Sequence, residues 1–448
     1  MTHEQAVAYW FGRVNYEQKT PRPSDLKLDR MRALLARLGN PQSRFRILHV
    51  TGSKGKGSTS AMLAAVLRHQ GYRVGLFTSP HLVHVEERVR VDDEPITSEE
   101  LTARLSEIRE AAQAPLPSED APLDDGLTFF EIATALGLLH FAYRRVEWAV
   151  LEVGLGGRLD STNVCIPNVA IVTSISYDHT QQLGNTLASI AWEKAGIFKR
   201  GRPAVSGVLD PEPRDVIETH ATEVGAPLRQ LGRDFHFDHE PARVDVDRPA
   251  RVRVATWRAA YPWLPLNLVG AHQAANAAVA IAALECLREQ GVPWTNGSLA
   301  AGLARVDWPG RLEIVQRRPL VLLDCAHNVA SAQALRDTIV SSFAGPKSSI
   351  LVFAGNRDKD LAGMLNVLQP LFDKIVLTRF ASNPRNVPPE RLRDLLPPTA
   401  EVHLADTPSA AIALARTLAN PDDLICVTGS VFLAGETRPL FRNGNEGK

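Results

Sequence analysis

The stretch Thr51-Gly52-Ser53-Lys54-Gly55-Lys56-Gly57-Ser58 decides the fold, because it is a glycine-rich loop between two predicted elements. Residues 46–51 form a short apolar run typical of a buried strand, and residues 58–70 predict a helix that ends at Gly71. Residues 73–78 predict another strand. The segment 46–78 therefore predicts a parallel strand–helix–strand unit with the loop between its first strand and its helix.

The chemistry of this loop suits phosphate. Glycines let backbone N–H groups turn inward as an anion-binding nest, and the following helix directs the positive end of its dipole at the bound group. Lys56 can neutralise phosphate charge, and the Ser58 hydroxyl can reach Mg²⁺. The spacing departs from the strict Walker pattern, since Gly57 separates Lys56 from Ser58. A purely structural turn is the alternative, but the position between a strand and a helix favours nucleotide binding.

The rest of the chain alternates predicted strands and helices. Residues 128–143 and 187–198 predict helices, and residues 148–153 and 168–174 predict strands, which favours a doubly wound sheet covered on both faces. Residues 244–257 alternate apolar and polar side chains and predict small antiparallel strands. Further strands, separated by helices, are predicted at 319–324, 349–354, 374–378 and 423–428.

A length of 448 residues suits two domains. We expect an α/β protein whose P-loop-type doubly wound domain spans residues 1–305 and includes a small β insertion near residues 202–268. A second, Rossmann-like α/β domain is expected at residues 312–448.

Composition excludes several classes of protein. Lys and Arg together number 50, as do Asp and Glu, so no net charge favours nucleic acid or an anionic membrane as partner. The four cysteines show no CxxC pairing, which argues against a zinc site and for reduced thiols. No signal peptide is visible, and the apolar stretch 274–287 is too short to cross a bilayer. We expect a cytoplasmic enzyme, and a monomer because no coiled-coil heptad is visible.

Together with the loop, motifs spread over nearly the whole chain resemble those of the folylpolyglutamate synthase/dihydrofolate synthase family within the Mur ligase superfamily. In chain order these motifs are Leu76-Phe77-Thr78-Ser79-Pro80-His81-Leu82, Leu127-Thr128-Phe129-Phe130-Glu131, Glu152-Val153-Gly154-Leu155-Gly156-Gly157-Arg158-Leu159-Asp160, Asp178-His179-Thr180, Glu193-Lys194-Ala195-Gly196-Ile197, Gly270-Ala271-His272-Gln273, Pro309-Gly310-Arg311, Asp324-Cys325-Ala326-His327-Asn328 and Asp358-Lys359-Asp360.

The resemblance implies an ATP-dependent ligase of the ADP-forming type. ATP would phosphorylate the carboxylate of dihydropteroate or a reduced folate, and the amine of L-glutamate would then displace phosphate to form an amide. A carboxylate is a poor electrophile, so the protein must chiefly position the reactants and neutralise charge. The resemblance does not separate dihydrofolate synthase from folylpolyglutamate synthase activity.

The resemblance also implies a metal centre. Two Mg²⁺ ions are expected, held by Ser58, Ser79, Glu152 and His179. Without the resemblance, Glu152 could be a solvated strand end, His179 a hydrogen-bonded loop residue and Ser79 a turn residue before proline. Mg²⁺ prefers oxygen ligands, so the imidazole rests on the resemblance alone.

Three residues are expected to be catalytic: Lys56, Lys194 and His327. The family's matching lysine is carbamylated by CO₂, which implies the same for Lys194 and requires a neutral amine. The ordinary alternative for Lys194 is a surface lysine. His327 is a candidate for contact with the transferring phosphate.

ATP would also contact several other residues. From the loop these are Ser53, Lys54, Gly55, Lys56, Gly57 and Ser58. The resemblance adds Asn276 at the adenine, with Arg311 and Asp324 in the C-terminal half. The alternatives are a helix-surface amide for Asn276, an interdomain salt bridge for Arg311 and a helix N-cap pair for Asp324 with Asn328.

The pteridine substrate would lie against three segments. The first segment is Asp25, Leu26, Lys27 and Leu28, the second is Thr128, Phe129 and Phe130, and the third is Leu159, Asp160 and Ser161. Phe129 and Phe130 could stack on a flat heterocycle or simply pack in the core.

The sequence departs from the family pattern at two places. Ser53-Lys54 stands where the family commonly has Thr-Asn, which adds a positive charge near the phosphates, and Val329 replaces a usual proline.

The alternatives to a folate ligase are a P-loop kinase or NTPase, a Mur-type ligase for another carboxylate, and a non-catalytic nucleotide-binding protein. A kinase or NTPase leaves the motif at residues 324–328 and Arg311 unexplained.

Overall fold

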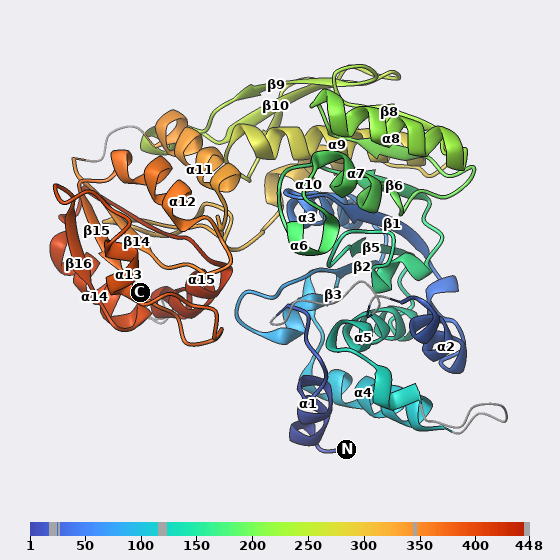
Figure 1. Cartoon of the computed structure of the whole chain (residues 1–448). Helices are drawn as coiled ribbons and strands as arrows, with labels where there is room; N and C mark the ends of the chain where they lie inside the picture. Colours follow the sequence, from blue (N-terminus) through green and yellow to red (C-terminus); the bar gives the residue numbers. More distant parts are fainter. Residues whose placement is uncertain (18–24, 26, 115–122, 344–346, 443–448) are drawn as a thin grey trace. The chain divides into compact units, whose positions relative to one another are not determined.

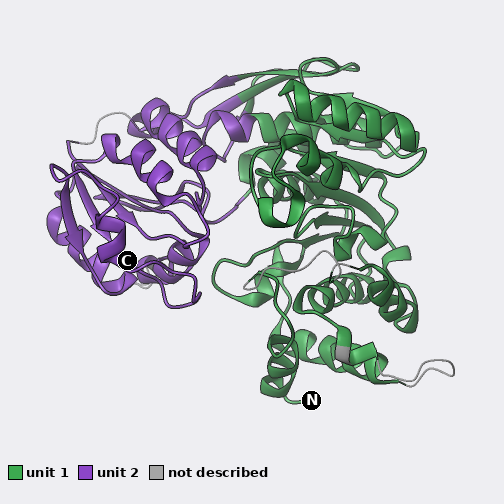
Figure 2. Ribbon diagram, viewed as in Figure 1, with its two compact units in different colours: residues 1–238, 252–264, 275–306 green, residues 239–251, 265–274, 307–448 purple. Residues whose placement is uncertain are grey.

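A computed structural model describes residues 1–17, 25, 27–114, 123–343 and 347–442. The chain divides into two compact units (Figure 2). Unit 1 comprises residues 1–238, 252–264 and 275–306, and unit 2 comprises residues 239–251, 265–274 and 307–448. Each unit is organised around its own β-sheet (Figure 1). The expected α/β class is confirmed.

Unit 1 contains an eight-stranded sheet in the order β4-β3-β2-β5-β1-β6-β7-β8. The six strands β2, β5, β1, β6, β7 and β8 run parallel to one another, whereas β3 and β4 pair in antiparallel fashion at one edge of the sheet. Their bounds are β1 Arg46–Thr51, β2 Val74–Phe77, β3 Val89–Val91, β4 Glu94–Pro95, β5 Trp148–Glu152, β6 Val169–Val172, β7 Ala204–Ser206 and β8 Leu228–Gln230.

The predicted strand–helix–strand unit is present, with another strand inside it. The helix α3, Lys56–His69, connects β1 to β2, and both strands run parallel to β5, which lies between them. All residues of β5 are buried, as expected for a central strand of a parallel sheet. The inserted strand places Glu152 at the same sheet edge as the glycine loop.

Helices cover both faces of this sheet. Phe77 and Leu151 share a hydrophobic core with Ile132 and Leu136 of α5, whereas α3 packs on α10 where Gly302 approaches Val66 (Figure 1). The helices of unit 1 are α1 His3–Phe11, α2 Asp29–Arg37, α3, α4 Ser98–Gln113, α5 Phe129–Tyr143, α6 Thr180–Leu183, α7 Leu187–Ala195, α8 Pro211–Val224, α10 Asn296–Arg305 and most of α9 Ala271–Glu289.

Unit 2 contains a six-stranded sheet in the order β12-β13-β17-β14-β15-β16, parallel except for β12. The strands are β12 Glu313–Arg317, β13 Leu320–Leu323, β14 Ser349–Phe353, β15 Lys374–Leu377, β16 Glu401–Leu404 and β17 Leu424–Thr428. The helices are α11 Val329–Ser342, α12 Leu361–Leu368, α13 Pro389–Arg393, α14 Pro408–Leu418, α15 Val431–Thr437 and α16 Pro439–Arg442. The predicted strands at 319–324, 349–354, 374–378 and 423–428 correspond to β13, β14, β15 and β17, whereas β12 and β16 were not predicted.

The predicted strands at residues 244–257 are partly wrong. Val244–Val246 forms a 3₁₀ helix, and a strand begins only at Ala250. Asp247 has a φ of 51°, a left-handed conformation that interrupts an extended chain. A small sheet is present, made of β9 His236–Glu240, β10 Ala250–Ala255 and β11 Leu264–Leu266, but β7 and β8, which lie within the insertion predicted near residues 202–268, belong to the eight-stranded sheet.

The four cysteines are buried and free. Within the described ranges, none of the helices combines the length and the hydropathy that a transmembrane span requires.

Candidate active site

The glycine loop leaves β1 in a conformation that side chains would obstruct. Gly52 has a φ of 150°, and a Cβ there would overlap the Thr173 hydroxyl. Gly55 is the N-cap of α3 with a φ of 83°, and a Cβ there would meet the Asn276 side chain. Both positions therefore require glycine. Asn276 is buried beside the loop rather than exposed on the surface of α9.

The segment that follows β6 holds the loop in place. Ser53 N donates to Ser174 O at 2.7 Å, and Lys54 N donates to Ser174 Oγ at 3.0 Å. In return the Thr173 hydroxyl donates to Lys54 O at 2.6 Å. Ser53 Oγ donates to Ser176 O at 2.9 Å. These hydrogen bonds therefore fix the conformation of the loop backbone.

Two lysine ammonium groups meet at one carbonyl of the loop. Lys56 Nζ lies 3.1 Å and Lys194 Nζ 3.0 Å from Gly52 O. Lys194 is buried, so it is not an ordinary surface lysine. Burial and the neighbouring Lys56 charge hold the pKa of Lys194 well below its usual value, with Lys54 acting in the same direction and Asp178 opposing.

Glu152 and Ser79 lie together at the carboxyl edge of the sheet. Glu152 is the last residue of β5 and is buried, and its Oε2 accepts from Ser79 N at 3.3 Å. Ser58 is buried in the first turn of α3. The pairing of β2 with β5 brings the two strand ends together.

His179 lies on the same sheet edge, after β6. It is the N-cap of α6, has a φ of 52° and is half exposed. Its neighbour Asp178 pairs with Lys54 at 2.7 Å. Across the part of the chain that the structure describes, no group of three His, Cys, Asp or Glu side chains is clustered as a metal site. The predicted set differs in kind, because it includes two serine hydroxyls.

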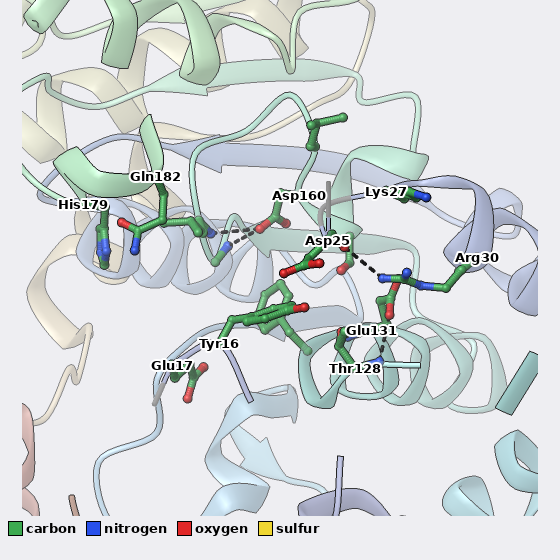
Figure 3. Close-up of a pocket in the computed structure, with 15 residues that line it drawn as sticks. Tyr16, Glu17, Asp25, Lys27, Arg30, Thr128, Glu131, Asp160, His179 and Gln182 are labelled. Atoms are coloured by element: carbon green, nitrogen blue, oxygen red, sulfur yellow. Dashed lines mark hydrogen bonds and ion pairs between the residues drawn. The ribbon is translucent and has the colours of Figure 1, made fainter. Parts of the chain in front are cut away.

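A pocket opens beside this edge in unit 1 (Figure 3). It brings together His179 and seven of the ten predicted substrate residues. Those seven are Asp25, Lys27, Thr128, Phe130, Leu159, Asp160 and Ser161. The remaining lining residues are Tyr16, Glu17, Arg30, Glu131, Gly154, Leu155 and Gln182.

Three predicted substrate residues do not line this pocket. Leu26 lies outside the described residues. Leu28 is the buried N-cap of α2. Phe129 is 1% exposed and stacks on Trp10 with ring centroids 4.9 Å apart, so its side chain belongs to the core.

Asp160 organises one wall of the pocket. One carboxylate oxygen accepts from Gly154 N at 3.0 Å and Leu155 N at 2.9 Å. The other accepts from the backbone N and the hydroxyl of Thr162 at 3.0 and 2.5 Å. Burial raises the pKa of Asp160, although these hydrogen bonds oppose the shift.

The opposite wall carries a charged pair that the sequence analysis did not assign. Arg30 Nε lies 3.2 Å from Glu131 Oε1, and Arg30 Nη2 donates to Asp25 O at 3.1 Å. Figure 3 shows this pair at one end of the pocket and His179 at the other. The spacing of Thr128 and Glu131 is a recognisable capping box, and Glu131 does accept from Thr128 N. No local pattern identified Tyr16, Glu17 or Gln182.

In unit 2 the predicted ATP contacts share one turn. Gly310 and Leu312, which flank Arg311, both have positive φ, at 70° and 50°. Asp324 Oδ2 accepts from Leu312 N at 3.1 Å, and Cys325 N donates to Gly310 O at 3.0 Å. Asp324 therefore braces the turn, and its pKa is raised by burial against the opposing Arg311 charge.

His327 follows the same strand end. Its Nδ1 lies 2.9 Å from Cys325 O, and because a carbonyl only accepts, Nδ1 carries a proton in this contact. Asn328 is the N-cap of α11, bonded to Ser331 N. Asp324 takes no part in that cap, and its Oδ1 accepts a hydrogen bond from Ala326 N instead.

The turn with Arg311 has a second brace. Gly310 N donates to Glu313 Oε2 at 2.9 Å, and Arg438 holds the Glu313 carboxylate with contacts of 2.7 and 2.9 Å. Both side chains are largely buried. Glu313 and Arg438 were not among the predicted residues, since they lie far apart in sequence.

Comparison with known proteins gives a consistent relationship. The Mur ligase middle domain model matches residues 50–284, and the Mur ligase glutamate ligase domain model matches residues 310–431. The dihydrofolate synthase/folylpolyglutamate synthase of Bacillus subtilis is 35% identical over 98% of this chain and 99% of its own. The Escherichia coli protein of that name is 35% identical over 95% of this chain and 93% of its own.

Solved structures agree with these sequence matches. The Escherichia coli FolC protein in complex with DHPP and ADP superposes with a TM-score of 0.85 at 31% identity, covering 99% of this chain and 98% of its own. The Mycobacterium tuberculosis folylpolyglutamate synthase complexed with ADP gives 0.87 at 32% identity and 98% coverage of both chains. The chain thus belongs to the dihydrofolate synthase/folylpolyglutamate synthase family of Mur ligases.

Proposed function

We propose that this protein joins L-glutamate to the carboxylate of dihydropteroate or a reduced folate, with cleavage of ATP to ADP and phosphate. The observation that supports this most directly is the pocket in unit 1. It gathers seven family-matched substrate residues, and His179 at its end belongs to the segment that anchors the phosphate loop. Substrate carboxylate and ATP phosphates can therefore approach one another within this unit.

The backbone of the loop residues Ser53 to Ser58 would bind the ATP phosphates, with Lys56 as the principal cation and Asn276 at the adenine. Transfer of the γ-phosphoryl group to the carboxylate gives an acyl phosphate. The amine of glutamate then attacks the acyl carbon, and inorganic phosphate leaves. In unit 2 we assign Arg311 and Asp324 to ATP and His327 to the transferring phosphate, on the family match and their common strand end.

The donor set suits divalent metal. Ser58, Ser79 and Glu152 offer oxygen atoms, which Mg²⁺ prefers, and His179 adds an imidazole. A related Yersinia pestis enzyme is described in complex with AMPPNP and Mn ion. We assign two Mg²⁺ ions to this set, where they would neutralise phosphate charge.

Lys194 is the proposed site of a carbamate. Its buried amine has a lowered pKa, so it can be neutral when CO₂ arrives. Formation of the N–C bond releases one proton and converts the side chain to an anion. That anion would offset the charges of Lys54 and Lys56 and help to organise the metal ions. We further expect a monomeric, cytoplasmic enzyme with no nucleic-acid or membrane partner.

The test is product analysis with purified protein, Mg-ATP and L-glutamate, supplied with dihydropteroate, a reduced folate or a peptidoglycan precursor. An amide product with either pteridine substrate, formed together with ADP and phosphate, supports the proposal. A stable phosphorylated product without an amide indicates a kinase, and an amide with the peptidoglycan precursor alone indicates another Mur ligase. The variant K56M should be inactive, whereas K347M, at an exposed lysine, should match the wild type.

A further inference from the structure

Lys54 belongs to the phosphate loop, and its ammonium is already engaged in an ion pair. Lys54 Nζ lies 2.7 Å from Asp178 Oδ2. The Asp178 side chain is only 7% exposed, so a nearby cation offsets the cost of burying its carboxylate. Lys54 supplies that cation from the phosphate loop. Its charge therefore compensates Asp178 rather than adding to the charge at the phosphates.

Asp178 also bonds the residue that follows it. Its second oxygen, Oδ1, accepts from His179 N at 3.1 Å. His179 has a φ of 52°, a left-handed conformation that a residue with a side chain adopts only when its surroundings enforce it. The carboxylate thus joins the ammonium of Lys54 to the backbone of His179.

The same two segments are also tied by the Ser53 hydroxyl. Ser53 Oγ donates to Ser176 O, and Ser176 N donates back to Ser53 Oγ, both at 2.9 Å. These contacts hold residues 53 and 176 but do not extend to His179. The Lys54–Asp178 pair extends this connection to the imidazole-bearing residue.

We infer that Lys54 is a positioning residue that acts through Asp178 to fix His179 for divalent metal, and that it is not a ligand of the ATP phosphates. This inference rests on the proposed function, because it assumes that His179 faces the metal of Mg-ATP. The distinction has measurable consequences. A phosphate ligand contributes to nucleotide affinity without metal, whereas a residue that positions a metal ligand contributes to metal affinity.

The experiment compares wild type, K54M, D178N, the double variant K54M/D178N, K54R and K56M. The affinity for ADP is measured by calorimetry in the presence of a chelator, and Mn²⁺ affinity is then measured by electron paramagnetic resonance on the ADP complex. K347M is the matched control, because Lys347 pairs with Asp422 at 3.3 Å on the exposed surface. Thermal denaturation checks that each variant folds, and K54Q replaces K54M if that variant does not.

K54M and D178N should each weaken Mn²⁺ binding by about tenfold, the usual effect of removing a group that orients a metal ligand. The double variant should be no weaker than either single variant, because both remove one interaction. Affinity for ADP without metal should change by less than about twofold, whereas K56M should lose it. K54R, which keeps the ion pair, should retain most of the Mn²⁺ affinity.

Loss of metal-free ADP affinity in K54M, to the extent seen in K56M, would overturn the inference in favour of a phosphate ligand. Multiplying effects of K54M and D178N would also overturn it, as would unchanged Mn²⁺ affinity in K54M. Failure of the proposed function looks different, since the wild type itself would then form no amide in the product assay.

Discussion

Lys56 and Lys194 donate to the same acceptor, the carbonyl oxygen of Gly52, at 3.1 and 3.0 Å. Lys56 belongs to the first turn of α3, whereas Lys194 comes from α7, well over a hundred residues later. Two adjacent ammonium groups repel one another, and Lys194 is the buried member of the pair. Burial and the neighbouring Lys56 charge therefore hold the pKa of Lys194 well below its usual value.

K194M should lose about 100-fold in ligase activity and should no longer respond to bicarbonate. Carbamate forms only on the neutral amine, so labelling of the wild type should rise with pH through the lowered pKa of Lys194. Nuclear magnetic resonance with isotope-labelled bicarbonate measures this directly. K199M is the control, because Lys199 also has a pKa lowered by burial but bonds Asn163 instead of the loop. A carbamate signal that persists in K194M and disappears in K199M would contradict the assignment.

G52A should unfold more readily than the wild type and bind no ATP. The new Cβ would overlap the Thr173 hydroxyl, and the φ of 150° is strained for alanine, so the loss should be about 3 kcal/mol. G71A separates the two causes, because Gly71 has a φ of 97° but open space around it. Its cost should be about 1 kcal/mol, from backbone strain alone. Thermal denaturation and ADP titration measure both variants, and equal losses would show that contact with Thr173 contributes little.

R438M should destabilise unit 2 by about 3 kcal/mol, because it leaves the largely buried Glu313 carboxylate without its arginine. E313Q/R438M should recover part of that loss, since glutamine is neutral and can still accept from Gly310 N. The exposed pair Arg318–Asp422 provides the control, and R318M should cost less than about 1 kcal/mol. Denaturation of the three variants gives the comparison. A double variant no more stable than R438M would argue against an uncompensated charge.

The buried His49 should make the protein sensitive to acid. Burial lowers the pKa of His49 to about 3, against about 6.5 in an unfolded chain, so the unfolded state alone binds a proton between these values. Stability should therefore fall as pH decreases, by about 2 kcal/mol between pH 7 and pH 5. In H49Q the fall in melting temperature over this range should be smaller by roughly 4 °C. H3Q, at an exposed position of α1, should behave as wild type, and an unchanged acid response in H49Q would contradict the prediction.

Sequence patterns located β1, β2, β5 and β6 because those strands are continuous apolar runs, whereas the shorter strands at the sheet edges were not predicted. The strand predicted at residues 46–51 has the bounds observed for β1. The pattern failed at Val244–Val246, where the left-handed Asp247 interrupts an alternation that otherwise reads as a strand. The position of β5 between β1 and β2 depends on pairing between distant residues, which no local pattern records.

The pocket-lining residues that match family segments were predicted, whereas the other lining residues were not. Phe129 and Phe130 are equivalent in the motif, but consecutive helix residues point about 100° apart, so one packs on Trp10 and the other lines the pocket. Tyr16 and Arg30 reach the pocket only through the packing of N-terminal segments on α5. The roles of the site residues and the domain limits 1–305 and 312–448 stay predictions.

Because β5 pairs with both β1 and β2, the nucleotide loop depends on residues translated well after its own. A nascent chain that ends before Trp148 carries the whole loop sequence but lacks the strand that keeps β1 and β2 in register. The loop is also anchored by residues 173–176, which emerge later still. Pairing over such separations is slow, because the chain loses the conformational entropy of a long loop before the stabilising contacts form. On the ribosome, the order of synthesis therefore sets when the growing polypeptide first becomes able to hold ATP.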